Sequence, residues 1–131
     1  MGRKPHPLKM VEQVKDKNAT SDQMLMIEKH ERVIAYLYPI IQRTPRCHGV
    51  VRDKLLACLF DQADHIMQAG KSGHISKLYA ADANLAMLRF YIRFYREGIR
   101  HLTTKQECHA LALIAEVGAL LGAWIKRKKG N

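Results

Sequence analysis

The strongest candidates for chemistry in this chain are four arginines that recur at spacings of three and four residues: Arg89, Arg93, Arg96 and Arg100. This spacing places them in one row along an α-helix. Like charges in such a row repel one another unless anions neutralise them, and arginine can bind a phosphate through two parallel hydrogen bonds. The row therefore predicts a binding site for a polyanion. A competing interpretation is that carboxylates of other helices, such as Asp61 and Asp64, pair with the arginines.

The distribution of charge supports a polyanionic partner. The net charge is +10, and residues 84–105 hold five cationic residues against one anionic residue. A charge excess of this size on a small domain favours nucleic acid as the partner, although it also serves solubility alone. Five further cations are expected to contribute to a nucleic-acid surface: Lys105, Lys126, Arg127, Lys128 and Lys129.

Histidine and cysteine offer weaker candidates. The pairs Cys47-His48 and Cys108-His109 do not match zinc-ligand spacing, because neighbouring residues on a helix point about 100° apart. Cys58 and Cys108 are expected to be small core residues. Phosphate-binding glycine loops and nucleophile motifs are missing from the sequence. We therefore expect no metal, no cofactor and no catalytic residue, and an odd cysteine count fits a reducing compartment.

One enzymatic pattern remains as an alternative. Arg43 to His48 and Arg96 to His101 both read R-x-x-x-x-H, which resembles the signature of HEPN-type ribonucleases. The resemblance implies a histidine general acid or base and an arginine that stabilises phosphate charge, without a metal. Such an offset arises easily in a chain rich in both residues.

A single helix is needed to carry the arginine row. An apolar stripe runs beside the row at the same spacing: Leu78, Ala81, Leu85, Leu88, Ile92, Tyr95 and Ile99. A second apolar set falls on the far side of that stripe: Met87, Phe90, Tyr91 and Phe94. A surface helix of a monomer needs an apolar stripe only a little over ~100° wide. We therefore expect this helix to pack inside its own domain and also against a partner.

Two helices are expected to precede it. The first is capped by Ser21 or Asp22, with an inward face that contains Ile27, His30, Ile34, Leu37 and Ile41. Pro39 is expected to kink this helix or end it early. The second helix runs from about Val50 to Ala69, with Leu55, Leu56, Leu59, Ala63 and Ile66 inward, and residues 70–73 break it.

A fourth helix follows the arginine-bearing helix, which ends around Gly98. Thr104 and Glu107 form a capping box at its start, and it continues to about Lys128. Gly118 and Gly122 within it suggest a close approach of another backbone, since glycine inside a helix costs about 1 kcal/mol. With Trp124, they are candidates for a subunit or partner interface.

These elements predict an all-α protein with three segments. Residues 1–20 form a basic, flexible arm, residues 21–128 an antiparallel up-down four-helix bundle, and residues 129–131 the end of a basic tail. We expect no apolar run of the ~18 residues that are needed to span a membrane. The N-terminal residues lack the apolar core of a signal peptide. These features favour a cytoplasmic protein.

Several stretches resemble a known family. They are Tyr38-Pro39, Thr44-Pro45-Arg46, the segment ANLAMLRFYIRFYREGIRHLTTKQ and the segment EVGALLGAWIK. Together they resemble the accessory variability determinant (Avd) proteins of diversity-generating retroelements, within the wider four-helix-bundle family of ribosomal-RNA intervening-sequence proteins. The resemblance covers roughly residues 21–128. Gly49 departs from the pattern, which leaves Arg46 and His48 as weak nucleic-acid candidates.

The resemblance implies a specific function. Avd proteins are non-enzymatic, barrel-like homopentamers that bind a reverse transcriptase and its template RNA and support mutagenic cDNA synthesis. Their basic surface would map here onto Arg89, Arg93, Arg96 and Arg100, with no membrane contact. A third reading is a nucleic-acid-binding four-helix bundle unrelated to retroelements.

Overall fold

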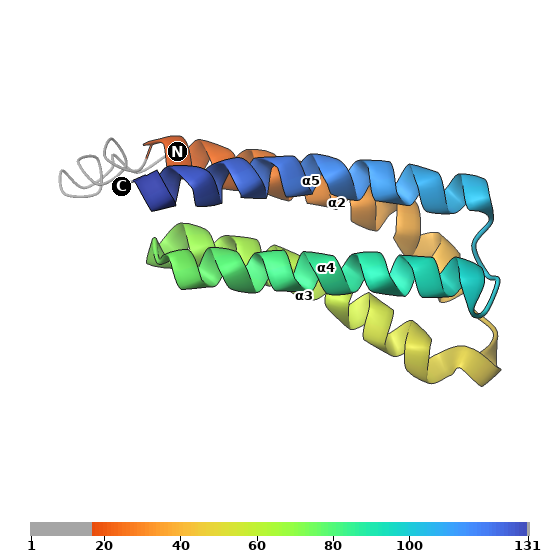
Figure 1. The fold of residues 1–131 in the computed structure, drawn as a ribbon. Helices are drawn as coiled ribbons and strands as arrows, with labels where there is room; N and C mark the ends of the chain where they lie inside the picture. Colours follow the sequence, from red (N-terminus) through yellow and green to blue (C-terminus); the bar gives the residue numbers. More distant parts are fainter. Residues whose placement is uncertain (1–16, 131) are drawn as a thin grey trace, which may run out of the picture.

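The computed structural model describes residues 17–130, and every regular element within that range is helical (Figure 1). The elements are α2 (Lys17–Gln42), a short 3-10 helix η1 (Arg46–His48), α3 (Gly49–Ser72), α4 (Ile75–Glu97) and α5 (Thr104–Gly130). Each long helix packs against the next one along the chain, and α2 also packs against α5. The predicted four-helix bundle is confirmed for the described residues, whereas its assembly into an oligomer stays a prediction.

The core forms where the apolar periodicity of the central helix predicted it. Six of the seven stripe residues are buried on α4: Leu78, Ala81, Leu85, Leu88, Ile92 and Tyr95. The bundle buries a further five residues of α5: Ala110, Ile114, Val117, Leu121 and Trp124. Burying a large apolar side chain contributes about 1.5–3 kcal/mol, so this shared interior is the main stabilising feature of the bundle.

The first helix differs from its prediction at its start. It already includes Lys17, and the carboxylate of Asp22 pairs with Arg127 of α5 rather than acting as a cap. It also continues through Pro39 to Gln42. Pro39 is exposed while Leu37 and Ile40 beside it are buried, so packing offsets the hydrogen bond that proline removes.

The inward face of α2 is also rotated from its prediction. Met26 and Val33 are fully buried, whereas Ile27 and Ile34 lie only half-buried at the edge of the core. His30 is buried as predicted. The rotation follows from packing between two neighbours, α3 and α5, which a single stripe on one helix does not specify.

The predicted break after α3 lies three residues too early. The helix runs to Ser72, with Gly70 inside it, and Gly73 makes the turn with a φ of 70°. A Cβ atom at Gly70 would collide with the side chain of Gln23, so this glycine allows α2 to approach α3 closely. Gly73 is the position that requires a left-handed backbone.

The capping box of α5 is one residue earlier than predicted. The Gln106 backbone N–H donates to Thr103 Oγ1, and the Thr103 N–H donates to Gln106 Oε1, each at 3.0 Å. The reciprocal pair satisfies two backbone donors at the helix start. Glu107 is therefore free for a different partner. At its other end α5 extends to Gly130, so Lys129 lies in its last turn.

One expectation about hydropathy is wrong. An 18-residue window of α5 has a mean hydropathy of 1.8 and is long and apolar enough, by length and composition alone, to cross a membrane. The core helix of a bundle passes the same test, and α5 contributes five buried residues to this core. Only 28% of the window is buried inside the bundle, which means that α5 also carries a weakly polar outer surface.

Candidate nucleic-acid interface on α4 and α5

The structure places three of the four arginines on α4. Arg89, Arg93 and Arg96 belong to the helix, but α4 ends at Glu97 and Arg100 lies in the connection to α5. Arg100 has a φ of 54°, in the left-handed region, so it does not continue the helical row. The predicted row of four is therefore a row of three followed by one arginine on a turn.

Arg89 lies against α5. It is half-buried, and a Cβ atom at Gly118 would be only 2.7 Å from Arg89 Nη2. Gly118 thus leaves room for an arginine of its own chain, which gives an internal reason for that glycine. At Gly122 no atom lies within 4 Å of the corresponding Cβ position, so its helix surface is open.

Arg96 is the arginine that carboxylates already neutralise. Its Nε lies 3.0 Å from Oε1 of Glu107 on α5, an ion pair whose N–H does not have hydrogen-bond geometry, and its Nη2 lies 3.3 Å from Oε1 of Glu97. A carboxylate of another helix thus pairs with this arginine, as the competing interpretation expected, but the carboxylate is that of Glu107 rather than Asp61 or Asp64. Arg96 ties the end of α4 to the start of α5.

Arg93 and Arg100 are the arginines best presented to a partner. Both are exposed, as is Lys105 at the start of α5. Among the side chains of residues 21–130, none forms an ion pair with any of these three. A phosphate approaching this side therefore meets cations without having to displace a carboxylate from them.

The cations at the end of α5 are partly engaged within the chain. Arg127 pairs with Asp22 of α2, and Lys129 Nζ lies 5.8 Å from the centroid of the Tyr79 ring. Lys128 is half-buried and lies near Gly73, whereas Lys126 is exposed. These contacts hold the end of α5 against α2 and α4 and leave Lys126 the most accessible cation there.

The second apolar set on α4 is largely exposed. Phe90 is 53% exposed and Met87 45%, and Phe90 stacks on Phe94 with ring centroids 6.4 Å apart. Met87 and the half-buried Tyr91 lie on the α3 side of α4, where they line a hollow with Lys54 and Asp61. The arginines and the aromatic residues thus occupy different sides of one helix, as predicted.

Trp124 does not belong to that exposed surface. Its side chain is 1% exposed and is among the largest buried in the core. It packs inside the bundle, so its predicted place at an interface is corrected. Aromatic residues serve cores and interfaces equally well, and the small residues around Trp124 gave no signal that distinguishes the two.

The structure gives Arg96 and His101, the second of the two Arg-to-His pairs, other contacts. His101 Nε2 lies 2.8 Å from the carbonyl oxygen of Ile40 and its ring packs edge-on against Tyr95, so it fixes the α4–α5 connection. Its would-be partner Arg96 is paired with Glu107. His48 is half-buried in η1, with Arg43 in the turn before that helix. Arg96 and His101 are thus each engaged with a partner of their own within the chain.

A buried network that sequence reasoning missed supports this end of the bundle. The Tyr95 hydroxyl donates to Thr44 Oγ1 at 2.7 Å, and Thr44 Oγ1 in turn donates to the carbonyl of Ile41 at 2.5 Å. Burial raises the pKa of Tyr95. The network joins the end of α2 to α4 beside the arginines, and no local sequence pattern marks a contact between residues so far apart.

Comparison with known proteins adds one match. A protein-family model described as bAvd-like matches residues 24–128, a range that includes most of α2, all of α3 and α4, and nearly all of α5. A search of curated proteins finds no match to the chain.

Proposed function

Because the chain belongs to the bAvd-like family, we propose that it is a non-catalytic accessory protein of a diversity-generating retroelement. In this role it binds the element's reverse transcriptase and template RNA and supports mutagenic cDNA synthesis. It works in the cytoplasm as a barrel-like homopentamer and needs no cofactor. The family match supports the general role, and the finer statements rest on the surfaces of α4 and α5.

The observation that carries RNA binding is a set of exposed cations on α4, α5 and their connection that have no carboxylate partner among residues 21–130. Arg93 lies on α4, Arg100 on the connection, and Lys105 and Lys126 on α5. Contacts between such cations and phosphates fix the position of a nucleic acid without reading its bases. We therefore propose that this side binds the RNA backbone, with Arg89, Lys128 and Lys129 as secondary contributors and with Arg96 and Arg127 mainly structural.

Assembly is proposed to use the other exposed features of the same two helices. Phe90, Phe94 and Met87 project from α4, while the outer face of α5 exposes small residues around Gly122. Large side chains of one copy can pack against the small-residue helix of the next copy. Such a contact joins two different surfaces, so repeated copies form a ring when the rotation closes.

The test is the salt dependence of RNA binding by the intact protein. Fluorescence anisotropy with a labelled fragment of the template RNA is measured over a series of salt concentrations. Each phosphate contact to single-stranded RNA should contribute about −0.7 to the slope of log K against log salt. We expect a slope of about −3 from four principal cations, and an affinity that does not change with salt would contradict this mode of binding.

The same samples separate the accessory role from the ribonuclease alternative. RNA recovered after prolonged incubation should be intact when run on a denaturing gel. Cleavage that is lost on His101→Ala substitution would replace the proposal with the enzyme. The proposed interaction with the reverse transcriptase is tested by co-purification of the two intact proteins.

A further inference from the structure

One end of the bundle carries cations that the proposed function does not use. The connection from α2 to α3 and the connection from α4 to α5 both lie at this end, whereas the turn from α3 to α4 lies at the other (Figure 1). Arg100 and Lys105, at the second connection and the start of α5, belong to the RNA surface proposed above. Arg43 and Arg46 lie on the α2–α3 connection and are exposed as well.

Hydrogen bonds hold the two connections side by side. His101 Nε2 lies 2.8 Å from a backbone carbonyl oxygen in the last turn of α2, and the Tyr95 hydroxyl is bonded to Thr44 Oγ1 at 2.7 Å. Arg43 directly precedes Thr44, and Arg100 directly precedes His101. These bonds therefore bring the cations of both connections to one end of the bundle.

The two connections contain cations and no carboxylate. The sequence has no aspartate or glutamate in residues 32–52 or in residues 98–106. Among the described side chains, none forms an ion pair with Arg43, Arg46 or Arg100. Each of these guanidinium groups can bind a phosphate through two parallel hydrogen bonds. The end of the bundle is thus a cationic surface that a phosphate reaches without displacing a carboxylate.

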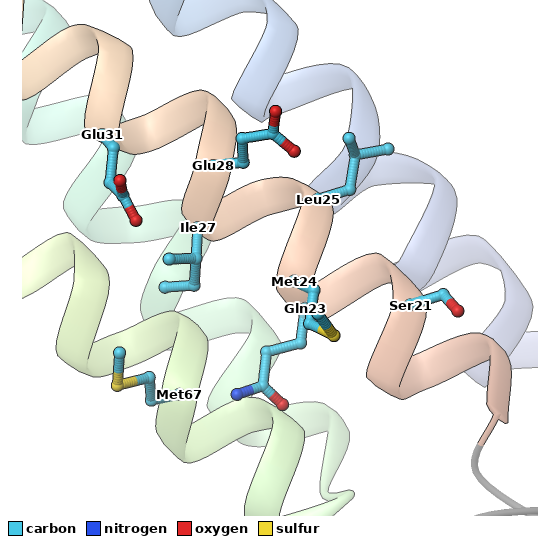
Figure 2. A pocket seen from close by; sticks show the side chains of 8 residues that line it. All are labelled: Ser21, Gln23, Met24, Leu25, Ile27, Glu28, Glu31 and Met67. Atoms are coloured by element: carbon cyan, nitrogen blue, oxygen red, sulfur yellow. The ribbon is translucent and has the colours of Figure 1, made fainter.

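The carboxylates of α2 lie at a distance from this end. Figure 2 shows Glu28 and Glu31 projecting from α2 beside a shallow hollow whose lining includes Met24 of α2 and Met67 of α3. Glu31 lies 11 residues before Gln42, the end of α2, which is roughly 16 Å along a helix at ~1.5 Å per residue. The charge balance within α2 and α3 therefore does not extend to the connection between them.

We propose that the RNA crosses this end of the bundle and that Arg43 and Arg46 bind its phosphates together with Arg100 and Lys105. The inference rests on the proposed function, because it extends the same RNA surface from α4 and α5 onto the α2–α3 connection. Contacts between these cations and phosphodiester oxygens hold the strand in place without reading its bases.

The backbone of both connections is held by hydrogen bonds. Two successive backbone N–H groups after Arg100 donate to the Tyr95 carbonyl, at 2.8 and 3.3 Å. Across the turn that contains Arg46, the His48 N–H donates to the Pro45 carbonyl at 2.9 Å. A backbone that is already ordered lowers the conformational entropy that binding costs. Mainly the arginine side chains have to be ordered when the RNA binds.

A hollow beside Arg100 offers room for a phosphate on this path. It has a volume of about 440 Å³ and is lined by Arg96, Glu97, Arg100, Leu102, Thr103 and Thr104. Its carboxylate, that of Glu97, lies 3.3 Å from Arg96 Nη2. Arg100 is therefore the lining cation available to a phosphate, and the threonine hydroxyls can donate further hydrogen bonds to it.

The first test is the salt dependence of RNA binding by the variant Arg43→Gln with Arg46→Gln. Two contacts beyond the four principal cations take the expected slope of log K against log salt for the unaltered chain to about −4, at about −0.7 per contact. The variant should return the slope to about −3 and weaken binding about tenfold at fixed salt, at about threefold for each lost contact. Anisotropy with the labelled template RNA fragment measures both.

A matched control removes the same charge at the opposite end of the bundle. Lys71→Gln with Lys77→Gln changes two exposed cations beside the turn from α3 to α4 and should leave the slope at about −4. Equal effects of the two pairs, or an unchanged slope in the Arg43 and Arg46 variant, would overturn this inference and leave the surface on α4 and α5 intact. Binding that does not depend on salt would contradict the proposed function itself. Circular dichroism of each variant confirms that the helices are intact.

Cysteine labelling tests the same surface without altering an arginine. Cys47 lies beside Arg46 in η1 and is exposed, whereas Cys58 is buried. Saturating template RNA should slow the reaction of Cys47 with N-ethylmaleimide at least threefold, measured by mass spectrometry of the labelled peptide. An unchanged rate would overturn the inference. Cys108 is also exposed, which corrects its expected place in the core, and its peptide is quantified separately.

Discussion

The two halves of this bundle have opposite surface characters although they share one core. The helices α2 and α3 each carry three cationic and three anionic residues, whereas α4 carries four against two and α5 five against two. On the α2–α3 side, a shallow hollow has Met24, Met67, Glu28 and Glu31 among its lining residues. On the α4–α5 side, exposed arginines and lysines lie beside phenylalanines.

The difference in charge suggests different roles for the two pairs of helices. Helices that only have to fold can balance their charges, because neutral surfaces minimise repulsion. Cations in a row without partners repel one another, which destabilises the folded state. A bound anion relieves this repulsion. The contrast therefore supports the proposal that RNA binds on α4 and α5, with α2 and α3 as the scaffold.

The largest expected effect is a charge reversal on the basic side. Arg93→Glu with Arg100→Glu should weaken RNA binding about 100-fold, at about tenfold for each reversed cation. Anisotropy titrations at fixed salt measure the loss. Arg32→Glu with Lys71→Glu makes the same change in net charge on α2 and α3 and should cost much less. Equal losses in both pairs would show that net charge alone determines binding.

The next effect concerns self-association. Phe90→Glu on α4 should dissociate the assembly, because a carboxylate cannot be buried against an apolar surface without a partner. Phe60→Glu on α3 is the matched control, since Phe60 is 46% exposed and Phe90 53%. Light scattering after size-exclusion chromatography gives the mass of each variant. If Phe60→Glu dissociated the assembly and Phe90→Glu did not, the interface would have to lie on the α2–α3 side.

A pH effect is expected from the scaffold side. Burial lowers the pKa of His30 and outweighs the hydrogen bond between its Nε2 and the Leu59 carbonyl, 2.6 Å away. The unfolded chain therefore binds a proton at His30 below about pH 6.5 that the folded chain excludes. Stability should fall as the pH drops below that value, by at most about 1.4 kcal/mol per pH unit, and level off below the folded-state pKa.

Urea unfolding at pH 7.5 and pH 5.5 measures this dependence. The His30→Gln variant should lose much of it, while His109→Gln, an exposed position stacked on Tyr36, should retain it. An unchanged pH dependence in the His30 variant would assign the effect to other groups.

The smallest effect is expected at the turn after α4. Arg100→Gly relieves a left-handed backbone worth about 1 kcal/mol and loses part of this gain to the greater chain entropy of glycine. The net stabilisation should be about 0.5 kcal/mol, visible as an increase in Tm of about 2 °C. RNA affinity should fall about threefold with the lost cation. A drop in Tm would show that the arginine side chain stabilises the turn.

Periodicity predicted the helices and the buried face of α4, because the 3.6-residue repeat depends on local sequence alone. It failed where tertiary packing overrode local signals. Pro39 predicts a kink or an early end of α2, and Gly70 predicts the start of a break. Buried neighbours hold the helix through Pro39, so the early end is wrong, and the close approach of Gln23 requires Gly70.

The candidate site was predicted in outline and not in detail. The arginine spacing correctly placed Arg89, Arg93 and Arg96 on one helix, but no local pattern could show that Glu107 neutralises Arg96 across the α4–α5 connection. Nor could it show that Gly118 accommodates Arg89. Both depend on which residues the antiparallel packing brings side by side.

The hydrogen bonds around Thr44 give the two ends of the bundle different resistance to opening. At that end, Tyr95 and His101 fasten the connection after α4 to the last turn of α2 and the residues just after it. At the other end, the ion pair of Asp22 with Arg127 and the contact of Lys129 with Tyr79 lie near the surface. Amide hydrogens should therefore exchange first near residues 21–25 and 126–130 and last near Tyr95. The termini of the bundle can separate transiently while the arginine-bearing end keeps its geometry.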